Sequence, residues 1–358
     1  MKIGIDISQV VYKTGVSQYT ANLVNNLLLL DKENEYILFG GSLRQIKALK
    51  EFTGMLSGNF QSKIFPFPPT LAHLIWNRLH VLPIENLIGR VDVFHSSDWT
   101  QPPTEAFKVT TIHDLVPFVC PRTANKEVVK THLSRLYRVK NEVDRIIAVS
   151  EATKKDIIEY LKISEEKIKV IYEAAGSEFK PRTEEEIEMT KKKYQLYGNY
   201  FLMVGGGPRK NIKNTVKAFE HAKAGKDFKL VMATSGKTIE GRGITQIKSF
   251  DDDDLSCLYA GAEALLYPSL YEGFGLSIVQ AFTCGCPVVT SNISSMAEIA
   301  EKAAVLVDPY NIDSIAEGIT KVIKEKMELK EKGFRRAKDF SWTKAAEETL
   351  KIYNEAKF

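Results

Sequence analysis

The chain has 358 residues, of which 44% are hydrophobic and 26% are charged, as in soluble globular proteins large enough for two domains. This composition excludes a disordered, collagen-like or coiled-coil protein, and an excess of four basic residues (49 against 45) is too small to indicate nucleic-acid binding. The first residues lack the apolar core and cleavage site of a signal peptide, so we expect a cytoplasmic protein.

Short apolar runs alternate with amphipathic stretches through the first half of the chain. Residues 16–30 and 152–161 have the apolar spacing of helices, and Ser150 is suited to cap the second of them. This alternation predicts a parallel sheet with helices on both faces. Strands are predicted at residues 1–8, 35–40, 63–67, 91–97, 109–115, 145–150 and 168–173.

A polar segment at 176–199 interrupts this pattern and predicts a solvated linker and helix. A second alternation follows, with a helix at 214–221 and a last helix at 341–358 that Ser341 caps. The sequence therefore predicts an α/β protein of two domains that join near 176–181. Strands of the second domain are predicted at residues 201–206, 229–235, 264–269, 287–292 and 303–309.

Ligands of open parallel sheets bind at the carboxyl ends of the strands, so the loops after the strands are candidate sites. In one such loop Glu272 precedes Gly273 and Gly275, and a helix is predicted to begin near Leu276. Backbone N–H groups at this helix start can bind phosphate or sugar, and the Glu272 carboxylate can accept bonds from hydroxyl groups. A glycine-rich turn before a buried helix is the alternative interpretation.

Three glycines (205–207) lie at the end of another predicted strand, and Arg209 and Lys210 follow them. Glycine permits a close approach of the backbone, and the two cations can bind a diphosphate. The spacing matches neither the P-loop nor the dinucleotide-binding motif, and a solvated basic turn is the alternative.

Two further candidate positions follow strands of the first domain. His113 and Asp114 end one strand, and Gly15 opens the loop between the first strand and the first helix. Both places are ligand positions in such a sheet, although a histidine among apolar residues is often structural.

The sequence predicts no metal site. The run Asp251–Asp254 is interpreted as a solvated turn that caps a helix starting at Asp253 or Asp254. Cys284 and Cys286 lack a second pair of zinc ligands, and we expect them to be packing residues.

The whole net positive charge comes from the segment between Arg122 and Arg145, which contains seven basic and three acidic residues. A solvated helix face is one interpretation of this segment. The alternative is a surface that meets an anionic acceptor or an anionic membrane.

Taken in order, these motifs resemble the retaining nucleotide-sugar glycosyltransferases of family 4, which have the GT-B fold of two Rossmann-like domains facing across a cleft. The PRKN and HDL…P forms are similar to the mannosyltransferase-like subgroup that builds surface polysaccharides. The resemblance implies an acceptor-binding domain at 1–178, a donor-binding domain at 179–340 and a helix at 341–358 that crosses back to the first domain. It spans almost the whole chain and includes TGVSQYTANL, VDVFHSS, TIHDLVPF, RIIAVSEATKKDI, FLMVGGGPRKNIKNTVKAF, LYAGAEALLYPSLYEGFGL, AFTCGCPVVTSN, AAVLVDP and FSWTKAAEETLKIY.

The resemblance also implies roles for single residues. His113 matches the active-site histidine of the family, and Glu272 matches the first glutamate of its E-x7-E motif, which contacts the donor sugar. Arg209 and Lys210 match the basic pair that neutralises the donor diphosphate. Contacts with the donor are further implied for Gly15, Gly205, Gly206, Gly273, Phe274, Gly275 and Leu276.

One position departs from the family. The second glutamate of E-x7-E, which binds the nucleotide ribose, is replaced by Gln280. Glutamine keeps one acceptor oxygen but loses the charge, so about 1 kcal/mol of donor binding is at stake. We expect weaker ribose binding with catalysis retained, because the ribose is remote from the bond that breaks.

The implied reaction transfers a hexose, with retention, from GDP-mannose or a UDP-sugar to a glycan or a lipid-linked saccharide, without metal or cofactor. A peripheral position at the inner face of the membrane, through residues 122–145, is part of this expectation. The main alternative is a catalytically inactive regulatory module that binds sugar nucleotides, and Gln280 is the feature in its favour. A further alternative is an epimerase or phosphorylase of the same double-domain fold.

Overall fold

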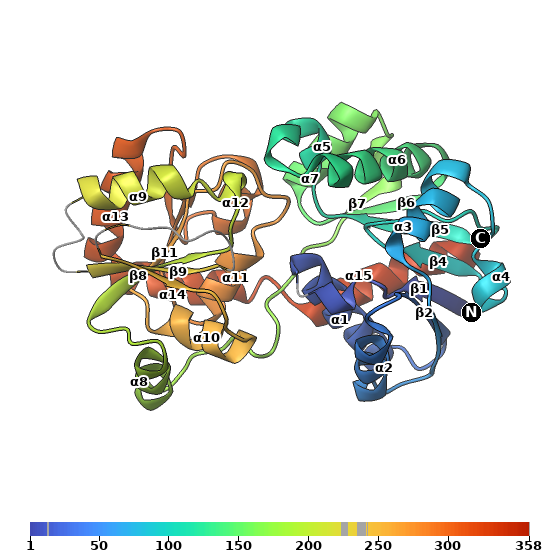
Figure 1. The fold of residues 1–358 in the computed structure, drawn as a ribbon, viewed down its shortest axis with the longest axis horizontal. Coiled ribbons are helices and arrows are strands. Elements are labelled where there is room, and N and C mark those ends of the chain that lie inside the picture. Colours follow the sequence, from blue (N-terminus) through green and yellow to red (C-terminus); the bar gives the residue numbers. More distant parts are fainter. Residues whose placement is uncertain (13, 223–227, 235–240, 242, 358) are drawn as a thin grey trace. The chain divides into compact units, whose positions relative to one another are not determined.

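The computed structural model describes residues 1–12, 14–222, 228–234, 241 and 243–357, which form two compact units (Figure 1). The first unit comprises Met1–Glu173 and Ser341–Phe358, and the second comprises Ala174–Phe340. The chain thus changes unit at 173/174, before the boundary at 178 that the sequence predicted. Directly after this change of unit, Phe179 packs against Tyr259 of the second unit, with ring centroids 6.1 Å apart.

The first unit is built on a parallel sheet of seven strands in the order β3-β2-β1-β4-β5-β6-β7. Chain order reverses between β1 and β4, where Ile3 is paired with Val93. The buried strands are rich in β-branched and aromatic residues, as expected for a sheet covered on both faces. The strands are β1 (Lys2–Asp6), β2 (Glu35–Gly41), β3 (Phe60–Phe65), β4 (Val93–Ser96), β5 (Phe107–Ile112), β6 (Arg145–Ala148) and β7 (Ile168–Val170).

Helices cover both faces of this sheet: α5 and α6 lie on one face, and α1, α2 and α15 lie on the other (Figure 1). Helix α15 packs along α1, where Trp342 meets Tyr19 with ring centroids 5.7 Å apart. The C-terminal helix therefore belongs to the first unit. The helices are α1 (Gly15–Leu30), α2 (Ile46–Met55), α3 (Pro69–Ala72), α4 (Glu85–Ile88), α5 (Val116–Val119), α6 (Lys126–Glu142), α7 (Glu151–Asp156) and α15 (Trp342–Asn354).

The second unit repeats this architecture with a parallel sheet of six strands in the order β10-β9-β8-β11-β12-β13. Chain order reverses here between β8 and β11, where Leu202 is paired with Leu265. The strands are β8 (Asn199–Val204), β9 (Phe228–Ala233), β10 (Ile244–Ile247), β11 (Leu265–Tyr267), β12 (Val288–Ser291) and β13 (Val305–Val307).

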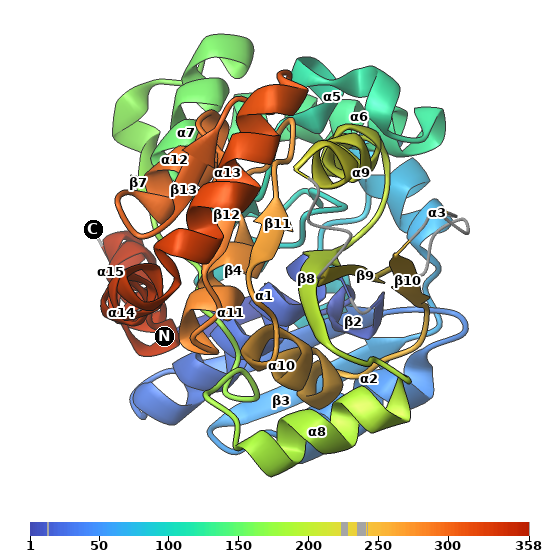
Figure 2. The same ribbon diagram turned by 90° about the vertical axis from the view of Figure 1, so that its left-hand side faces the viewer.

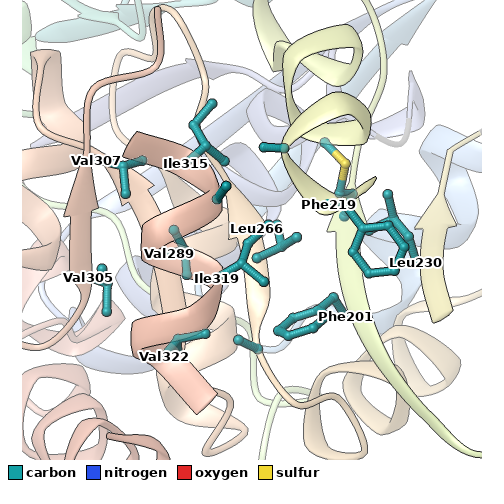
Figure 3. Close-up of a cluster of buried hydrophobic side chains, with 14 of the residues drawn as sticks. Phe201, Phe219, Leu230, Leu266, Val289, Val305, Val307, Ile315, Ile319 and Val322 are labelled. Carbon is teal, nitrogen blue, oxygen red and sulfur yellow. The ribbon is translucent and has the colours of Figure 1, made fainter. Parts of the chain in front are cut away.

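One face of the second sheet carries α9 and α13, as the view in Figure 2 shows. Side chains from both helices and from the strands form a buried hydrophobic cluster, in which Phe219, Ile315 and Ile319 are fully covered (Figure 3). The helices are α8 (Glu184–Lys193), α9 (Ile212–His221), α10 (Asp252–Ala260), α11 (Leu276–Thr283), α12 (Ser294–Ala300), α13 (Ile312–Lys324) and α14 (Lys326–Ala337).

The two parallel α/β sheets that the sequence predicted are confirmed, and the differences are local. Strand β10 is not among the predicted strands, because its four residues are only partly buried except Ile247. Ser150 and Ser341 accept backbone N–H groups at the starts of their helices, as predicted. Helix α10 begins at Asp252, earlier than predicted, because Asp251 forms the capping box with Asp254.

Among the described residues, no helix combines the length and the apolar composition that crossing a bilayer requires.

Candidate functional site

Lys210 and Glu272 come together at the carboxyl edge of the second sheet. Lys210 ends the turn that follows β8, and Glu272 lies in the loop that follows β11. Since β8 and β11 are the neighbours between which chain order reverses, both side chains stand at the ligand position of a doubly wound sheet.

The Lys210 ammonium group makes three polar contacts. Its Nζ lies 2.7 Å from Glu272 Oε1, and it also donates to the hydroxyl of Tyr267. The same nitrogen lies 4.3 Å from the centroid of the Tyr267 ring, within the range of a cation–π contact. The side chains of Lys210 and Glu272 are only 19% and 13% exposed, so this ion pair is largely shielded from water.

Both members of the pair stay ionised at neutral pH. Burial alone would lower the pKa of Lys210, but the charge of Glu272 and the contact with Tyr267 raise it above its ordinary value. Burial alone would raise the pKa of Glu272, but the positive charges of Lys210 and then Arg209 lower it. The Arg209 charge therefore acts on the same carboxylate, and the predicted trio of Arg209, Lys210 and Glu272 is assembled in one place.

The glycines after β8 leave room for this arrangement. Gly205 has a φ of +84°, and a Cβ there would lie 3.0 Å from Lys210 Cε. A Cβ on Gly206 would lie 2.7 Å from the hydroxyl oxygen of Thr234. Any larger residue at Gly205 would therefore strain the backbone and press on the lysine.

Serine and threonine side chains fix the loop that carries Glu272. Ser294 and Ser295 each donate to the backbone carbonyl of Glu272 at 2.8 Å. Thr290, on β12, donates to the carbonyl of Tyr267 at 2.9 Å. These bonds hold the backbone of the carboxylate in place, and none of these hydroxyl residues was among the candidate positions of the sequence.

The turn from Gly273 to Leu276 leads into α11. Gly275 stands at the cap with a φ of +101°, and no side chain caps this end of the helix. Leu276 is the first residue of the helix, and Phe274 is buried against Phe340, with ring centroids 5.8 Å apart. The helix therefore starts with N–H groups that no cap side chain bonds, which suits an anion or hydroxyl oxygen.

Gln280 is buried in the second turn of α11, at 4% exposure. Its Oε1 accepts a hydrogen bond of 3.2 Å from the hydroxyl of Tyr259, which is itself buried. The amide oxygen of Gln280 is therefore already hydrogen-bonded within the second unit.

Side chains of the acidic run are engaged by other residues of the second unit. Asp253 pairs with Arg182, and Asp254 is buried and bonds Lys193 and Tyr194. This corrects the prediction of a turn solvated throughout, since tertiary partners cover Asp254. Within the described part of the chain, no group of three or more His, Cys, Asp or Glu side chains could hold a metal ion.

Cys284 and Cys286 are buried as packing residues. Burial raises the pKa of the Cys284 thiol to about 11, which leaves it protonated at neutral pH.

In the first unit, His113 is paired with a carboxylate that the sequence analysis did not identify. Its Nδ1 lies 3.0 Å from Glu173 Oε1, and the two side chains are 11% and 6% exposed. Burial alone would lower the pKa of His113, but the hydrogen bond and the charge of Glu173 raise it above the ordinary value. The only sequence signal of Glu173 is a charged residue directly after a predicted buried strand.

Aromatic and hydroxyl groups surround this pair. The ring of Tyr19, on α1, stands edge-on to the His113 ring with centroids 4.6 Å apart. The Tyr19 hydroxyl and His95 Nε2 both contact the hydroxyl of Thr111 at 2.9 Å. Burial lowers the pKa of His95 to about 3, so His95 is neutral and structural.

Gly15 is the first residue of α1, and it is exposed. Thr14 caps the helix and exchanges bonds with Ser17 in a capping box. A Cβ on Gly15 would meet nothing within 4 Å, so packing in this structure does not require glycine there.

The basic segment 122–145 is divided between the interior and the surface. Arg135 is fully buried and binds Asp98 and Thr110, while Arg138 donates to two backbone carbonyls and Arg145 pairs with Glu355. The other four basic residues are exposed: Arg122, Lys126, Lys130 and Lys140.

Two family models match the chain and together span most of it. The model described as Glycosyltransferase Family 4 matches residues 14–175, and the one described as Glycosyl transferases group 1 matches residues 184–340. The boundary between them lies close to the boundary between the two units.

Known proteins give the same result in sequence and in fold. The O-antigen chain mannosyltransferase B of Escherichia coli is 28% identical over an alignment of 368 positions. The alignment includes 95% of this chain and 96% of that protein. A glycosyltransferase of Rickettsia africae has a similar structure, with a TM-score of 0.72 at 19% identity, over 99% of this chain and 98% of the other. So has HepE of Anabaena, solved with UDP and glucose, with a TM-score of 0.71 at 15% identity, over 99% and 100% of the two chains.

Proposed function

Because the chain belongs to the glycosyltransferases of family 4 and group 1 and has the GT-B fold, we propose that it transfers a hexose from a nucleoside-diphosphate sugar, with retention at the anomeric carbon. One observation carries the proposal: the Lys210–Glu272 ion pair at the carboxyl edge of the second sheet, with the charge of Arg209 beside it.

The reaction breaks the bond between the anomeric carbon and the diphosphate, and negative charge grows on the departing oxygen. Lys210 and Arg209 stabilise that charge, and the N–H groups at the start of α11 add a partial positive charge. Glu272 orients the ammonium group of Lys210 and offers its second oxygen to a hydroxyl group of the donor sugar. Gly205, Gly206 and the Gly273–Leu276 turn let the backbone approach the donor.

His113 has the active-site role in the first unit. With Glu173 accepting from Nδ1, Nε2 of His113 is the nitrogen left for a substrate. The first unit binds the acceptor and the second binds the donor under this proposal. Gln280 lies on the ribose side of the donor and bonds it weakly, without charge.

The transferred sugar is mannose in this proposal, because the Escherichia coli relative that aligns over nearly the whole chain is a mannosyltransferase of O-antigen chains. The donor is GDP-mannose, with a UDP-sugar as the other candidate. The acceptor is a glycan or a lipid-linked saccharide, and no metal or cofactor takes part.

We further propose peripheral contact with the cytoplasmic face of an anionic membrane through residues 122–145. On α6, Lys126, Lys130, Leu133, Tyr137 and Lys140 are all exposed. Steps of three and four residues place them on one stripe of the helix, where lysines flank two large apolar groups. Such a stripe suits the interface of an anionic bilayer.

The proposal is tested with purified protein in two stages. A thermal-shift screen of nucleoside diphosphates and their sugars identifies the donor, and a transfer assay with that donor and mannobiose follows. The expected product has the anomeric configuration of the donor, which NMR coupling constants establish. Donor binding with neither transfer nor hydrolysis would instead support the regulatory module.

A further inference from the structure

A cavity of about 480 Å³ opens at the carboxyl edge of the first sheet. Residues of the loops after β1 and β4 line it, among them Ser8 and Asp98. Chain order reverses between these two strands, so the cavity occupies the position where doubly wound sheets bind ligands. Its volume lies within the range of about 300–1,000 Å³ of small-molecule sites.

The wall of the cavity is aromatic. It is lined by Phe39, Phe67, Trp76 and Trp99. Trp99 is only half-buried, and its ring makes a T-shaped contact with the ring of His132, with centroids 5.3 Å apart. The faces of aromatic rings carry partial negative charge and attract the weakly positive C–H groups of a flat apolar ligand face. A pyranose ring presents such a face, with its hydroxyl groups around the edge.

Two carboxyl groups of the cavity are held in fixed positions. Asp6 ends β1 with 4% exposure, and its Oδ1 accepts the backbone N–H of Ser8 at 2.9 Å. Asp98 is 13% exposed, and its Oδ1 accepts from the buried guanidinium of Arg135 at 3.1 Å. An ionised carboxylate can accept four bonds, so a fixed Asp98 retains capacity to bind hydroxyl groups.

The charges of the lining do not suit a phosphate. Among the lining residues that the structure describes, none is lysine or arginine, and the acidic ones are Asp6 and Asp98. Arg135 lies behind Asp98 and is committed to it and to Thr110. Among these described residues, a phosphate would meet two carboxyl groups and neither a lysine nor an arginine.

We infer that this cavity binds the uncharged saccharide end of the acceptor, with a sugar ring stacked on Trp99 and its hydroxyl groups donating to Asp98. The inference rests on the proposed glycosyl transfer and specifies its acceptor: the part that enters the first unit is a neutral sugar, and any lipid diphosphate of the acceptor lies outside the cavity.

The test is saturation-transfer NMR with no donor present, using four neutral disaccharides as probes: mannobiose, cellobiose, lactose and chitobiose. At least one should bind the wild-type protein, and Trp99→Ala and Asp98→Asn should each raise its Kd at least about tenfold. Tyr197→Ala, which removes an exposed aromatic ring of the second unit, is the control and should bind as the wild type does. Inorganic pyrophosphate should not displace the sugar.

Each contrary result overturns the inference: no disaccharide binds, Trp99→Ala binds as tightly as the wild type, or pyrophosphate displaces the sugar. Asp98→Asn could fail to fold because Arg135 loses its partner. In that case the Kd of the disaccharide for Trp99→Ala alone tests the inference, since Trp99 is only half-buried. The result is separable from the proposed function. If Trp99→Ala transfers sugar with the acceptor KM of the wild type, the cavity is not the acceptor site, but the proposed transfer stands. If the wild-type protein binds the disaccharide but neither transfers sugar nor hydrolyses a donor, the proposed transfer is wrong, but the cavity still binds sugar.

Discussion

The ammonium nitrogen of Lys210 lies 2.7 Å from a carboxylate oxygen of Glu272, although the two residues are 62 positions apart in the chain. Each partner shifts the pKa of the other toward the charged form, so the lysine brings a full positive charge to a largely buried position. In a place shielded from water, such a charge interacts strongly with any anion that forms nearby. Under the proposed function, this cation is the group that stabilises the leaving diphosphate.

Replacing Lys210 with alanine should lower kcat/KM on the order of 100-fold or more, because it removes stabilisation of the charge that develops on the leaving group. Initial rates over a range of donor concentrations measure the effect. Glu272 would lose its partner, so the melting temperature must be recorded as well.

Lys217→Ala is the matched control, since Lys217 is an exposed lysine on the following helix, α9. It should leave both kcat/KM and the melting temperature unchanged. Turnover of Lys210→Ala at the wild-type rate would show that Lys210 is not part of the active site.

Replacing Glu173 with glutamine should lower the pKa of His113. Glutamine can still accept the Nδ1–H bond, but without the carboxylate charge the effect of burial prevails and the pKa should fall below its ordinary value of 6.5. NMR titration of the imidazole resonances measures it. His95 is an internal control, because its pKa of about 3 keeps it neutral above pH 5 in both proteins.

The same pair makes stability depend on pH. A histidine whose pKa is raised by folding stabilises the folded state fully below its unfolded pKa, and that contribution disappears as the pH rises through the folded pKa. The free energy of unfolding of the wild type should therefore exceed that of Glu173→Gln most between about pH 5 and 6.5, and the excess should shrink at higher pH. A difference that is constant with pH would mean that His113 is neutral in the folded protein.

How far the sequence could predict these sites depends on the range of the interactions. Local signals succeeded: Ser150 and Ser341 cap helices three residues from the N–H groups that they accept. The approach of Lys210 to Glu272 was also predictable, because both follow strands of one parallel sheet. The partner of His113 was not, because Glu173 follows β7, which β6 separates from β5, the strand before His113, whereas β8 and β11 are direct neighbours.

The basic segment shows the same limit. Counting charges on the sequence treats Arg135 and Lys140 alike, yet Arg135 is fully buried and Lys140 is exposed. The difference arises from Asp98, whose carboxylate offers Arg135 a partner across the fold. Charge patterning can therefore locate a segment but cannot separate its structural cations from those available to a membrane.

Activity should survive a chelator. The acidic run that resembles a metal motif is engaged in the fold, with Asp251 capping α10 and Asp254 bound to Lys193 and Tyr194. Transfer rates measured with and without an excess of EDTA should agree. A loss of activity that magnesium or manganese restores would contradict this expectation.

Replacing Gln280 with glutamate should lower the donor KM or leave it unchanged. The Tyr259 hydroxyl can donate to a carboxylate at this position, and a charged acceptor bonds ribose hydroxyls about twice as strongly as a neutral one. Gln280→Met, which removes the acceptor, should raise the donor KM with little change in kcat. A large loss of activity in Gln280→Glu would show that this position does not meet the ribose.

The exposed stripe of α6 should bind anionic vesicles. Co-sedimentation should increase when phosphatidylglycerol is added to phosphatidylcholine vesicles, and salt should weaken it. Each lysine near an anionic surface contributes about 1 kcal/mol, so reversing Lys126, Lys130 and Lys140 to glutamate should weaken binding on the order of 100-fold.

Reversal of Lys217, Lys321 and Lys324 is the matched control, because these lysines are equally exposed but belong to the second unit. The control changes the net charge by the same amount, so it separates the stripe from the overall charge. Leu133 and Tyr137 should add an apolar contribution that salt does not remove. Equal binding of both triple variants, or binding that does not respond to anionic lipid, would show that the stripe is only a solvated helix face.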